Sequence, residues 1–439
     1  MFFSKSGLWD VSDYGSTPKF NAGEKGKVFV TEKDRDILRK LAEEVAILAG
    51  KSIESEKRDL WLKHNSLKTK IPVIFCDPEN GWNEIIKGND ILCKSELAKK
   101  WEMVLRKEIF WAEEIRDDKV IEPLFEIGYT YTDSGWGIET KINRKESSGA
   151  CAWNAPIKGY EDLSRIKMPQ LNIDSDTTDQ TLGLAKDIFK NILEVRSRGV
   201  WWWTLGMTLD LAMLRGLEQI MYDMPDNPEL INNLMRKIQE GTIGKLNYLE
   251  KNNLLSLNSS SYVGSGGFGY TDELPSGKKD DIKLKDLWGF GESQETGQIS
   301  PQMFEEFVFK YQLPVLEKFG LNCYGCCEPL EKRWQIIKKI PNLRRVSVSS
   351  WSDCRKMADL LQDKYIFSLK PNPAQLSVSE INLEYVSKNI KQYLDVTKDC
   401  VTEIIMKDNH TLGKNPDNVK NWVKTVSYTH LTLPTIYSV

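Results

Sequence analysis

The chain has 439 residues, of which 40% are hydrophobic and 28% charged, and its formal net charge is -3. This composition is typical of a globular core, and the interleaved acids and bases argue against a nucleic-acid partner. Residues 1–10 lack a secretory pattern, and no run approaches about 18 apolar residues, so we expect no membrane partner and a cytoplasmic location. Eight cysteines in a chain of this length predict free thiols in a reducing compartment.

The N-terminal part is predicted to form a helical extension over residues 1–70. Thr31 can cap a helix whose apolar residues recur at helical spacing, and Gly50 can end it. His64 lies in a polar, lysine-rich stretch, so we expect its side chain to be solvated.

Short apolar runs predict strands along the rest of the chain. They are Ile71–Cys76, Leu124–Thr132, Val200–Leu205, Leu254–Asn258, Leu287–Phe290, Leu321–Tyr324, Leu343–Val348, Tyr365–Leu369 and Val401–Met406. Helical stretches lie between most of them, at 211–221, 228–250, 332–340, 379–393 and 418–424, and Ser300–Pro301 opens a further helix. This alternation predicts an α/β fold, a closed (β/α)₈ TIM barrel over residues 71–425. An open doubly wound sheet is the alternative.

Residues 426–439 require a separate interpretation. The segment from Val426 to Thr435 corresponds to the translation of a sequencing-library adapter, which indicates read-through in a metagenomic assembly. A native β-prone tail is the alternative. If the adapter interpretation holds, His430 is not native, and only His64 and His410 remain as histidines.

A cysteine cluster follows the strand predicted at 321–324. Cys326, Cys327 and Glu328 are consecutive there, at a strand end where parallel α/β proteins usually place chemistry. Thiolates and carboxylates together favour zinc. His410 follows the last predicted strand and is the candidate fourth ligand, with Asp408 as a partner for its ring. The alternatives are buried structural cysteines and a surface histidine, and which of the two cysteines ligates stays open.

A second polar group follows the strand predicted at 287–290. Glu292 and Glu295 are candidates for general acid/base catalysis, and Gln294 is a candidate for substrate binding. A solvated loop is the alternative for this segment.

Three further features are candidates for a substrate pocket. Asp77 and Trp82 follow the first predicted strand, and Trp202 lies in a run of three tryptophans, for which core packing is the alternative. The segment 264–269 matches G-x-G-x-x-G, but no apolar helix follows it, so we expect a mobile active-site loop and no nucleotide.

Two segments resemble the uroporphyrinogen decarboxylase-like superfamily, which includes the cobalamin-dependent methyltransferases. Residues 300–316 resemble its helix motif SPxxFxxFxxPyxxxi, and residues 214–229 resemble its G-x-E-x-x-x-x-D-x-x-x-x-P stretch. The resemblance covers roughly residues 70 to 424, and it implies a (β/α)₈ barrel.

The resemblance also implies a function. The R-Q-A-G-R signature of the porphyrinogen decarboxylases is absent. The methyltransferase branch binds zinc through His-x-Cys-Gly and a later Cys. Here Tyr324, a catalytic candidate, stands in place of that His, Cys326 matches the Cys, and His410 lies near the place of the second Cys.

The resemblance therefore implies a zinc-dependent methyltransferase that moves a methyl group between a small-molecule donor or acceptor and a corrinoid on a partner protein. The alternatives are a metal-free decarboxylase of the uroporphyrinogen decarboxylase type and a non-catalytic tetrapyrrole- or corrinoid-binding barrel.

Overall fold

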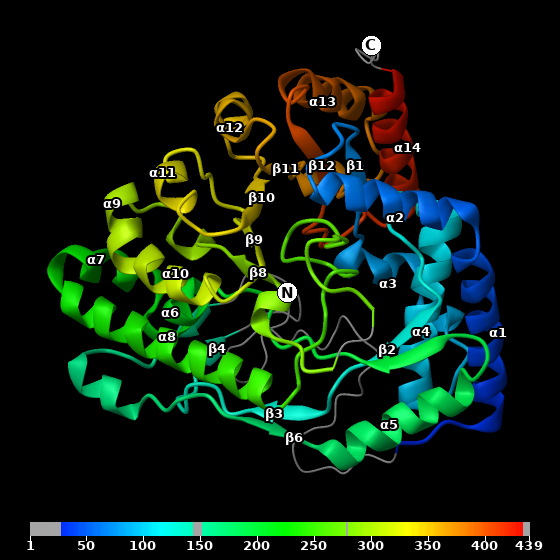
Figure 1. The fold of residues 1–439 in the computed structure, drawn as a ribbon, viewed down its shortest axis with the longest axis horizontal. Coiled ribbons are helices and arrows are strands. Elements are labelled where there is room, and N and C mark those ends of the chain that lie inside the picture. Colours follow the sequence, from blue (N-terminus) through cyan, green and yellow to red (C-terminus); the bar gives the residue numbers. More distant parts are fainter. Residues whose placement is uncertain (1–27, 144–151, 278–279, 433–439) are drawn as a thin grey trace.

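The computed structural model describes residues 28–143, 152–277 and 280–432 (Figure 1). Its centre is a parallel sheet of six strands in the order β1-β12-β11-β10-β9-β8. Their bounds are β1 (Val73–Cys76), β8 (Trp288–Gly291), β9 (Leu321–Tyr324), β10 (Leu343–Val348), β11 (Ile366–Leu369) and β12 (Val401–Met406). The first of these strands pairs with the last, as in a barrel.

Six further strands form three separate pairs. β2 (Leu124–Ile127) and β7 (Glu194–Ser197) are parallel, whereas β3 (Tyr131–Asp133) with β6 (Leu171–Ile173) and β4 (Lys141–Asn143) with β5 (Ala152–Asn154) are antiparallel. Among the described residues, no strand pairing joins the β2–β7 pair to the six-stranded sheet. The α/β class with a parallel sheet is confirmed, and the closed ring of eight strands stays a prediction.

Backbone amides along the free edge of β1 donate hydrogen bonds to acidic side chains. The Ile74 amide donates to Asp118 Oδ2 (2.7 Å) and the Cys76 amide donates to Asp117 Oδ2 (2.8 Å), where a neighbouring strand would offer carbonyls. These bonds explain why the sheet stops at β1 without leaving buried amides unpaired.

Helices connect the strands and lie outside the sheet, with α10 to α14 around its outer side (Figure 1). In the first half of the chain they are α1 (Glu32–Ala49), α2 (Ser52–Asn65), α3 (Trp82–Ile85), α4 (Glu96–Phe110), α5 (Ser175–Ile188), α6 (Thr208–Arg215), α7 (Leu217–Asp226) and α8 (Pro228–Lys251). In the second half they are α9 (Pro301–Phe304), α10 (Lys310–Leu316), α11 (Trp334–Ile337), α12 (Cys354–Leu361), α13 (Leu383–Val396) and α14 (Asp417–Thr432).

Several predicted element ends are confirmed. Thr31 caps α1 through a bond to the Asp34 amide, Gly50 ends that helix, and Ser300 caps α9. The helix predicted at 211–221 is wrong as a single element, because Gly216, with φ +93°, separates α6 from α7.

Two predicted strands are wrong. The strand predicted at 200–205 does not form, and the strand nearest to it is β7, which ends at Ser197. Beyond Gly199, the Trp201 side chain donates from Nε1 to the Leu254 carbonyl (2.7 Å). The segment 254–258 forms no strand, because the Asn258 side chain bonds both the amide and the carbonyl of Trp288.

A fully buried ion pair lies on the inner side of the sheet. Arg345 of β10 and Glu403 of β12 are both 0% exposed, and Arg345 Nε lies 3.0 Å from Glu403 Oε1. Ser368 Oγ donates to the same carboxylate (2.5 Å), and His64 Nε2 of α2 lies 3.3 Å from it. His64 is therefore buried, which corrects the prediction of a solvated side chain. Its burial holds the pKa of the imidazole below its ordinary value.

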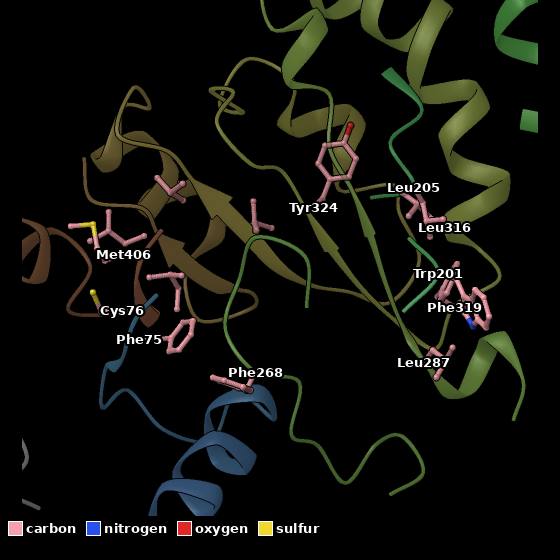
Figure 2. Packing of buried hydrophobic residues seen from close by; sticks show 14 of the residues in the cluster. Phe75, Cys76, Trp201, Leu205, Phe268, Leu287, Leu316, Phe319, Tyr324 and Met406 are labelled. Atoms are coloured by element: carbon pink, nitrogen blue, oxygen red, sulfur yellow. The ribbon is translucent and has the colours of Figure 1, made fainter. Parts of the chain in front are cut away.

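The glycine-rich segment 264–269 packs against this ion pair. The Gly267 amide donates to Glu403 Oε1 (3.1 Å), and the Phe268 carbonyl accepts from Arg345 Nη2 (3.1 Å). Figure 2 shows Phe268 facing Phe75 of β1, with ring centroids 5.0 Å apart. The segment is thus mostly buried inside the sheet, and the prediction of a mobile loop is wrong.

The last described helix includes the first part of the segment interpreted as adapter-encoded. Val426 is fully buried, and α14 continues to Thr432. The origin of this segment stays a prediction. Among the described helices, none combines the length and the apolar composition that crossing a membrane requires.

We predict that Gly267→Ala destabilises the protein by about 1–3 kcal/mol, because overpacking a filled core forces neighbours to shift. A Cβ at this position would lie 2.3 Å from the Trp61 ring. Urea unfolding of the variant and the wild type measures the difference.

Gly244→Ala is the matched control, because a Cβ there meets nothing within 4 Å on helix α8. It should raise the free energy of unfolding by about 0.5–1 kcal/mol. Equal stability of both variants would contradict the packing described for segment 264–269.

Candidate active site

The carboxyl end of β9 carries a pair of adjacent thiols. Gly325, with φ +95°, turns the chain as the strand ends, and a Cβ there would lie 2.6 Å from Leu330. Cys326 and Cys327 follow, with their sulfurs 3.6 Å apart. Cys326 is buried and Cys327 is exposed, so the pair connects the interior with the surface.

Asp408 of the loop after β12 contacts this pair. Its Oδ2 lies 3.7 Å from Cys327 Sγ. The sequence suggested Asp408 as a partner for the imidazole, whereas the structure directs it to a thiol. Asp408 has φ +61°, and Glu79 at the end of neighbouring β1 has φ +47°. Non-glycine residues rarely adopt this conformation, and such residues cluster at functional sites.

Glu328 and His410 lie differently from the predicted ligand set. The Glu328 carboxylate is buried and accepts from the amides of Ser293 (2.7 Å) and Cys326 (3.0 Å), so it ties the thiol loop to the end of β8. The exposed His410 has its Nδ1 3.3 Å from Asn80 Nδ2. Across the described residues, no group of three or more His, Cys, Asp or Glu side chains is arranged to hold a metal ion as the side chains stand.

Buried acids lie behind the thiol loop. Glu292 is 0% exposed, accepts from Thr204 Oγ1 (3.2 Å) and from the Gln294 amide (2.9 Å), and lies near Glu295 and Glu328. Burial, and then the charges of those two acids, raise the pKa of Glu292 well above its ordinary value. A neutral carboxyl at this point can act as an acid.

The other candidates near these acids have structural partners. Gln294 Nε2 donates to Glu295 Oε1 (3.2 Å), and Glu295 Oε2 accepts from Thr208 (2.7 Å). The Tyr324 hydroxyl is buried and donates to Gln312 Oε1 (2.7 Å). Their direct contact with a substrate stays a prediction.

A cavity of about 320 Å³ lies between Asp77, which follows β1, the β2–β7 pair and the segment 260–270. Of the predicted substrate-binding residues, Asp77 and Trp202 line it. Trp82 does not, since its Nε1 donates to Asp77 Oδ1 (3.3 Å) and its ring packs on Trp111. The aromatic side chains of the cavity wall include Tyr129, Tyr131, Trp201, Trp202, Trp203 and Tyr262.

Lys407 connects the cavity wall with the thiol edge. Its Nζ lies 4.2 Å from the centre of the Tyr262 ring and donates to the Gly264 carbonyl (3.3 Å), and both residues line the cavity. The next residue, Asp408, contacts Cys327. Lys370 also lies near, and burial lowers its pKa to about 8.

Sequence reasoning did not single out the buried pair or these lysines. Arg345 and Glu403 each interrupt an apolar strand run, and a charge inside a buried strand is a signal for an inward-facing polar residue. Lys407 directly follows the last predicted strand, which could also have drawn attention to it.

Comparisons with known proteins find similar solved structures, whereas the sequence comparisons find no match. The sequence matches no known family and no curated protein. The fold is similar to the solved structure of a methyltransferase from Methanosarcina mazei, with 10% sequence identity, a TM-score of 0.46, and coverage of 85% of this chain and 98% of that one. A likeness at this level does not establish a family, and the resemblance to the uroporphyrinogen decarboxylase-like superfamily stays a prediction.

We predict that Glu292→Gln stabilises the protein relative to the wild type at pH 8 more than at pH 5. A carboxyl with a raised folded pKa contributes stability that is complete below its unfolded pKa of about 4.3 and is lost as the pH rises through the folded pKa. Glutamine resembles the protonated form and can keep both hydrogen bonds. Between pH 5 and 8, the free energy of unfolding of the variant minus that of the wild type should grow by up to about 1.4 kcal/mol per pH unit. Urea unfolding at several pH values measures it.

Glu305→Gln is the control, since Glu305 lies on the surface beside Lys339. This substitution should change the free energy of unfolding by less than about 1 kcal/mol, and the change should not grow with pH. If the stability of Glu292→Gln ran parallel to the wild type between pH 5 and 8, the raised pKa of Glu292 would be refuted.

Proposed function

We propose that this chain is a zinc-dependent methyltransferase, which moves a methyl group between a small substrate and a corrinoid on a partner protein. The observation that supports it is the thiol pair of Cys326 and Cys327, 3.6 Å apart at the carboxyl edge of the sheet. Two thiolates on a tetrahedral zinc with Zn–S bonds of about 2.3 Å lie roughly 3.8 Å apart, so the spacing fits.

The residues fit such an ion in part. Cys326 and Cys327 would be its sulfur ligands, and Asp408, which already contacts Cys327, offers an oxygen. Glu328 holds the thiol loop through two backbone amides, so we propose it as a positioning residue. His410 faces Asn80 and would have to turn to take part. When bound, zinc acts as a Lewis acid that lowers the pKa of a substrate thiol or polarises an ether oxygen.

The chain's own residues would bind the substrate and handle the proton. The aromatic cavity would hold the substrate and keep water away, and Lys407 would present a positive charge between the cavity and the thiol pair. Glu292, whose pKa is raised by burial, would keep a proton available behind the thiol loop, with Glu295 beside it.

We predict that the purified protein binds about one zinc ion per chain and that Cys326→Ser and Cys327→Ser each weaken zinc binding more than tenfold, since each removes a ligand. Elemental analysis after equilibrium dialysis measures the content. Cys354→Ser, at the start of α12, is the control and should keep the ion.

The activity is tested with methylcobalamin and 2-mercaptoethanol as probes. The thiol releases its proton, the Co–CH₃ bond breaks with its electron pair staying on cobalt, and an S–CH₃ bond forms. The corrinoid leaves as cob(I)alamin, which its absorbance reports. We expect turnover by the wild type and by Cys354→Ser, and its loss in Cys326→Ser. A wild type that retains no zinc would refute the proposal and favour a metal-free enzyme such as a decarboxylase. Serine variants that retain zinc fully would refute the thiol pair as its ligands.

A further inference from the structure

We infer that the adjacent thiols of Cys326 and Cys327 are a reversible oxidation site, which reacts with low-molecular-weight disulfides and closes to a disulfide bond between the two residues. That this oxidation releases zinc and stops methyl transfer rests on the proposed function. The formation of the disulfide bond itself depends on neither zinc nor methyl transfer.

The two sulfur atoms already lie side by side. In a strand, consecutive side chains point to opposite faces, which would separate adjacent thiols. Here the strand has ended at Tyr324, and the chain turns at Gly325, with φ +95°. The sulfurs of Cys326 and Cys327 consequently lie 3.6 Å apart. Since a disulfide bond is about 2.05 Å long, its formation requires an approach of about 1.6 Å.

The backbone that carries the pair is fixed by other groups. The Glu328 carboxylate accepts from the Cys326 amide (3.0 Å) and from the Ser293 amide (2.7 Å). The turn is closely packed, because a Cβ on Gly325 would lie 2.6 Å from Leu330. These contacts involve neither sulfur, so the loop can keep its shape while the thiols react.

The two thiols differ in their access to solvent, and this difference sets the order of reaction. Cys327 is exposed, whereas Cys326 is only 3% exposed. The Cys327 thiol donates to Asp408 Oδ2 (3.7 Å) at the protein surface. An oxidant in solution therefore reaches Cys327 first, and Cys326 lies behind it as the resolving thiol. Redox-sensitive cysteines are often accessible and placed next to a resolving cysteine.

The reaction is a thiol–disulfide exchange in two steps. In the first, the Cys327 sulfur gives up its proton and attacks one sulfur of the small disulfide, whose S–S bond breaks, and one small thiol leaves with that proton. In the second, the Cys326 sulfur gives up its proton and attacks the Cys327 sulfur, and the second small thiol leaves with it. The two protein thiols are thus oxidised to one disulfide, and the small disulfide is reduced to two thiols.

A disulfide bond between neighbours in the sequence is easily reduced again. Consecutive Cα atoms lie about 3.8 Å apart across a trans peptide, whereas disulfide-bonded residues generally have Cα atoms about 4.4–6.8 Å apart. The bond is therefore strained, and strained or exposed disulfides are reduced more readily than structural ones. We expect the pair to stay reduced in a thiol-rich medium and to oxidise when small disulfides accumulate.

Oxidation and metal binding compete for the same sulfur atoms. A thiolate is the form of cysteine that ligates a metal, and a disulfide bond leaves neither sulfur as a thiolate. Under the proposed function, the oxidised chain would lose both sulfur ligands of zinc. Methyl transfer would then stop until a thiol reduces the bond.

The test is the reaction of the full chain with glutathione disulfide after dialysis against EDTA. Trypsin releases the peptide 319–332, which contains Cys323 as well as Cys326 and Cys327. Tandem mass spectrometry should show this peptide lighter by two hydrogen atoms, with the bond between Cys326 and Cys327. Dithiothreitol should reverse the change.

Serine variants identify the two thiols. In Cys326→Ser the reaction should stop at a mixed disulfide of Cys327 with glutathione, and Cys327→Ser should form no bond within the peptide. Cys354→Ser is the control and should react like the wild type. A bond from Cys323 to Cys326, or a wild type that stays unmodified or stops at the mixed disulfide, would overturn the inference. The wild-type peptide decides the case if a variant does not fold.

Zinc binding separates this inference from the proposed function. The oxidised chain should bind zinc at least about tenfold more weakly than the reduced chain, and reduction should restore the affinity. A reduced chain that binds no zinc but still forms the disulfide bond would refute the proposed function and support the oxidation site. An oxidised chain that binds zinc as tightly as the reduced chain would overturn the effect that we infer for the oxidation.

Discussion

The buried ion pair of Arg345 and Glu403 is the interaction on which the arrangement of the site depends. Two charges removed from water destabilise a fold unless they are paired and hydrogen-bonded. Here the partners are Ser368, the Gly267 amide and the Phe268 carbonyl. The pair therefore fixes the glycine-rich segment inside the sheet, and that segment supplies one wall of the cavity. A substitution in this pair should therefore change the shape of the cavity, although neither residue of the pair lines it.

Two candidate regions, the cavity and the thiol pair, are connected near this wall. The cavity lies on the inner face of β2 and β7, and the thiol pair lies at the carboxyl end of β9. Lys407 contacts the first region and precedes Asp408, which contacts the second. Asp408 has a positive φ, an uncommon conformation for a non-glycine residue, and its carboxylate contacts Cys327. This continuity is why a ligand in the cavity and a metal at the thiols would form one site.

The sequence predicted the central strands well, because continuous apolar runs such as Val401–Met406 have few alternatives in a parallel sheet. The segments 200–205 and 254–258 failed because Trp201 and Asn258 bond backbone groups that a strand would use, and no periodicity reveals such bonds. The thiol pair was visible because its members are adjacent. Its contact with Asp408 and the burial of His64 depend on distant partners that only the fold brings together.

The central claim is that Cys326 and Cys327 together hold a zinc ion, and X-ray absorption at the zinc edge of the purified protein tests it most directly. The account predicts two sulfur ligands at about 2.3 Å, with lighter atoms filling the other positions. In Cys327→Ser the number of sulfur ligands should fall to one. Zinc coordinated only by nitrogen and oxygen in the wild type would contradict the account.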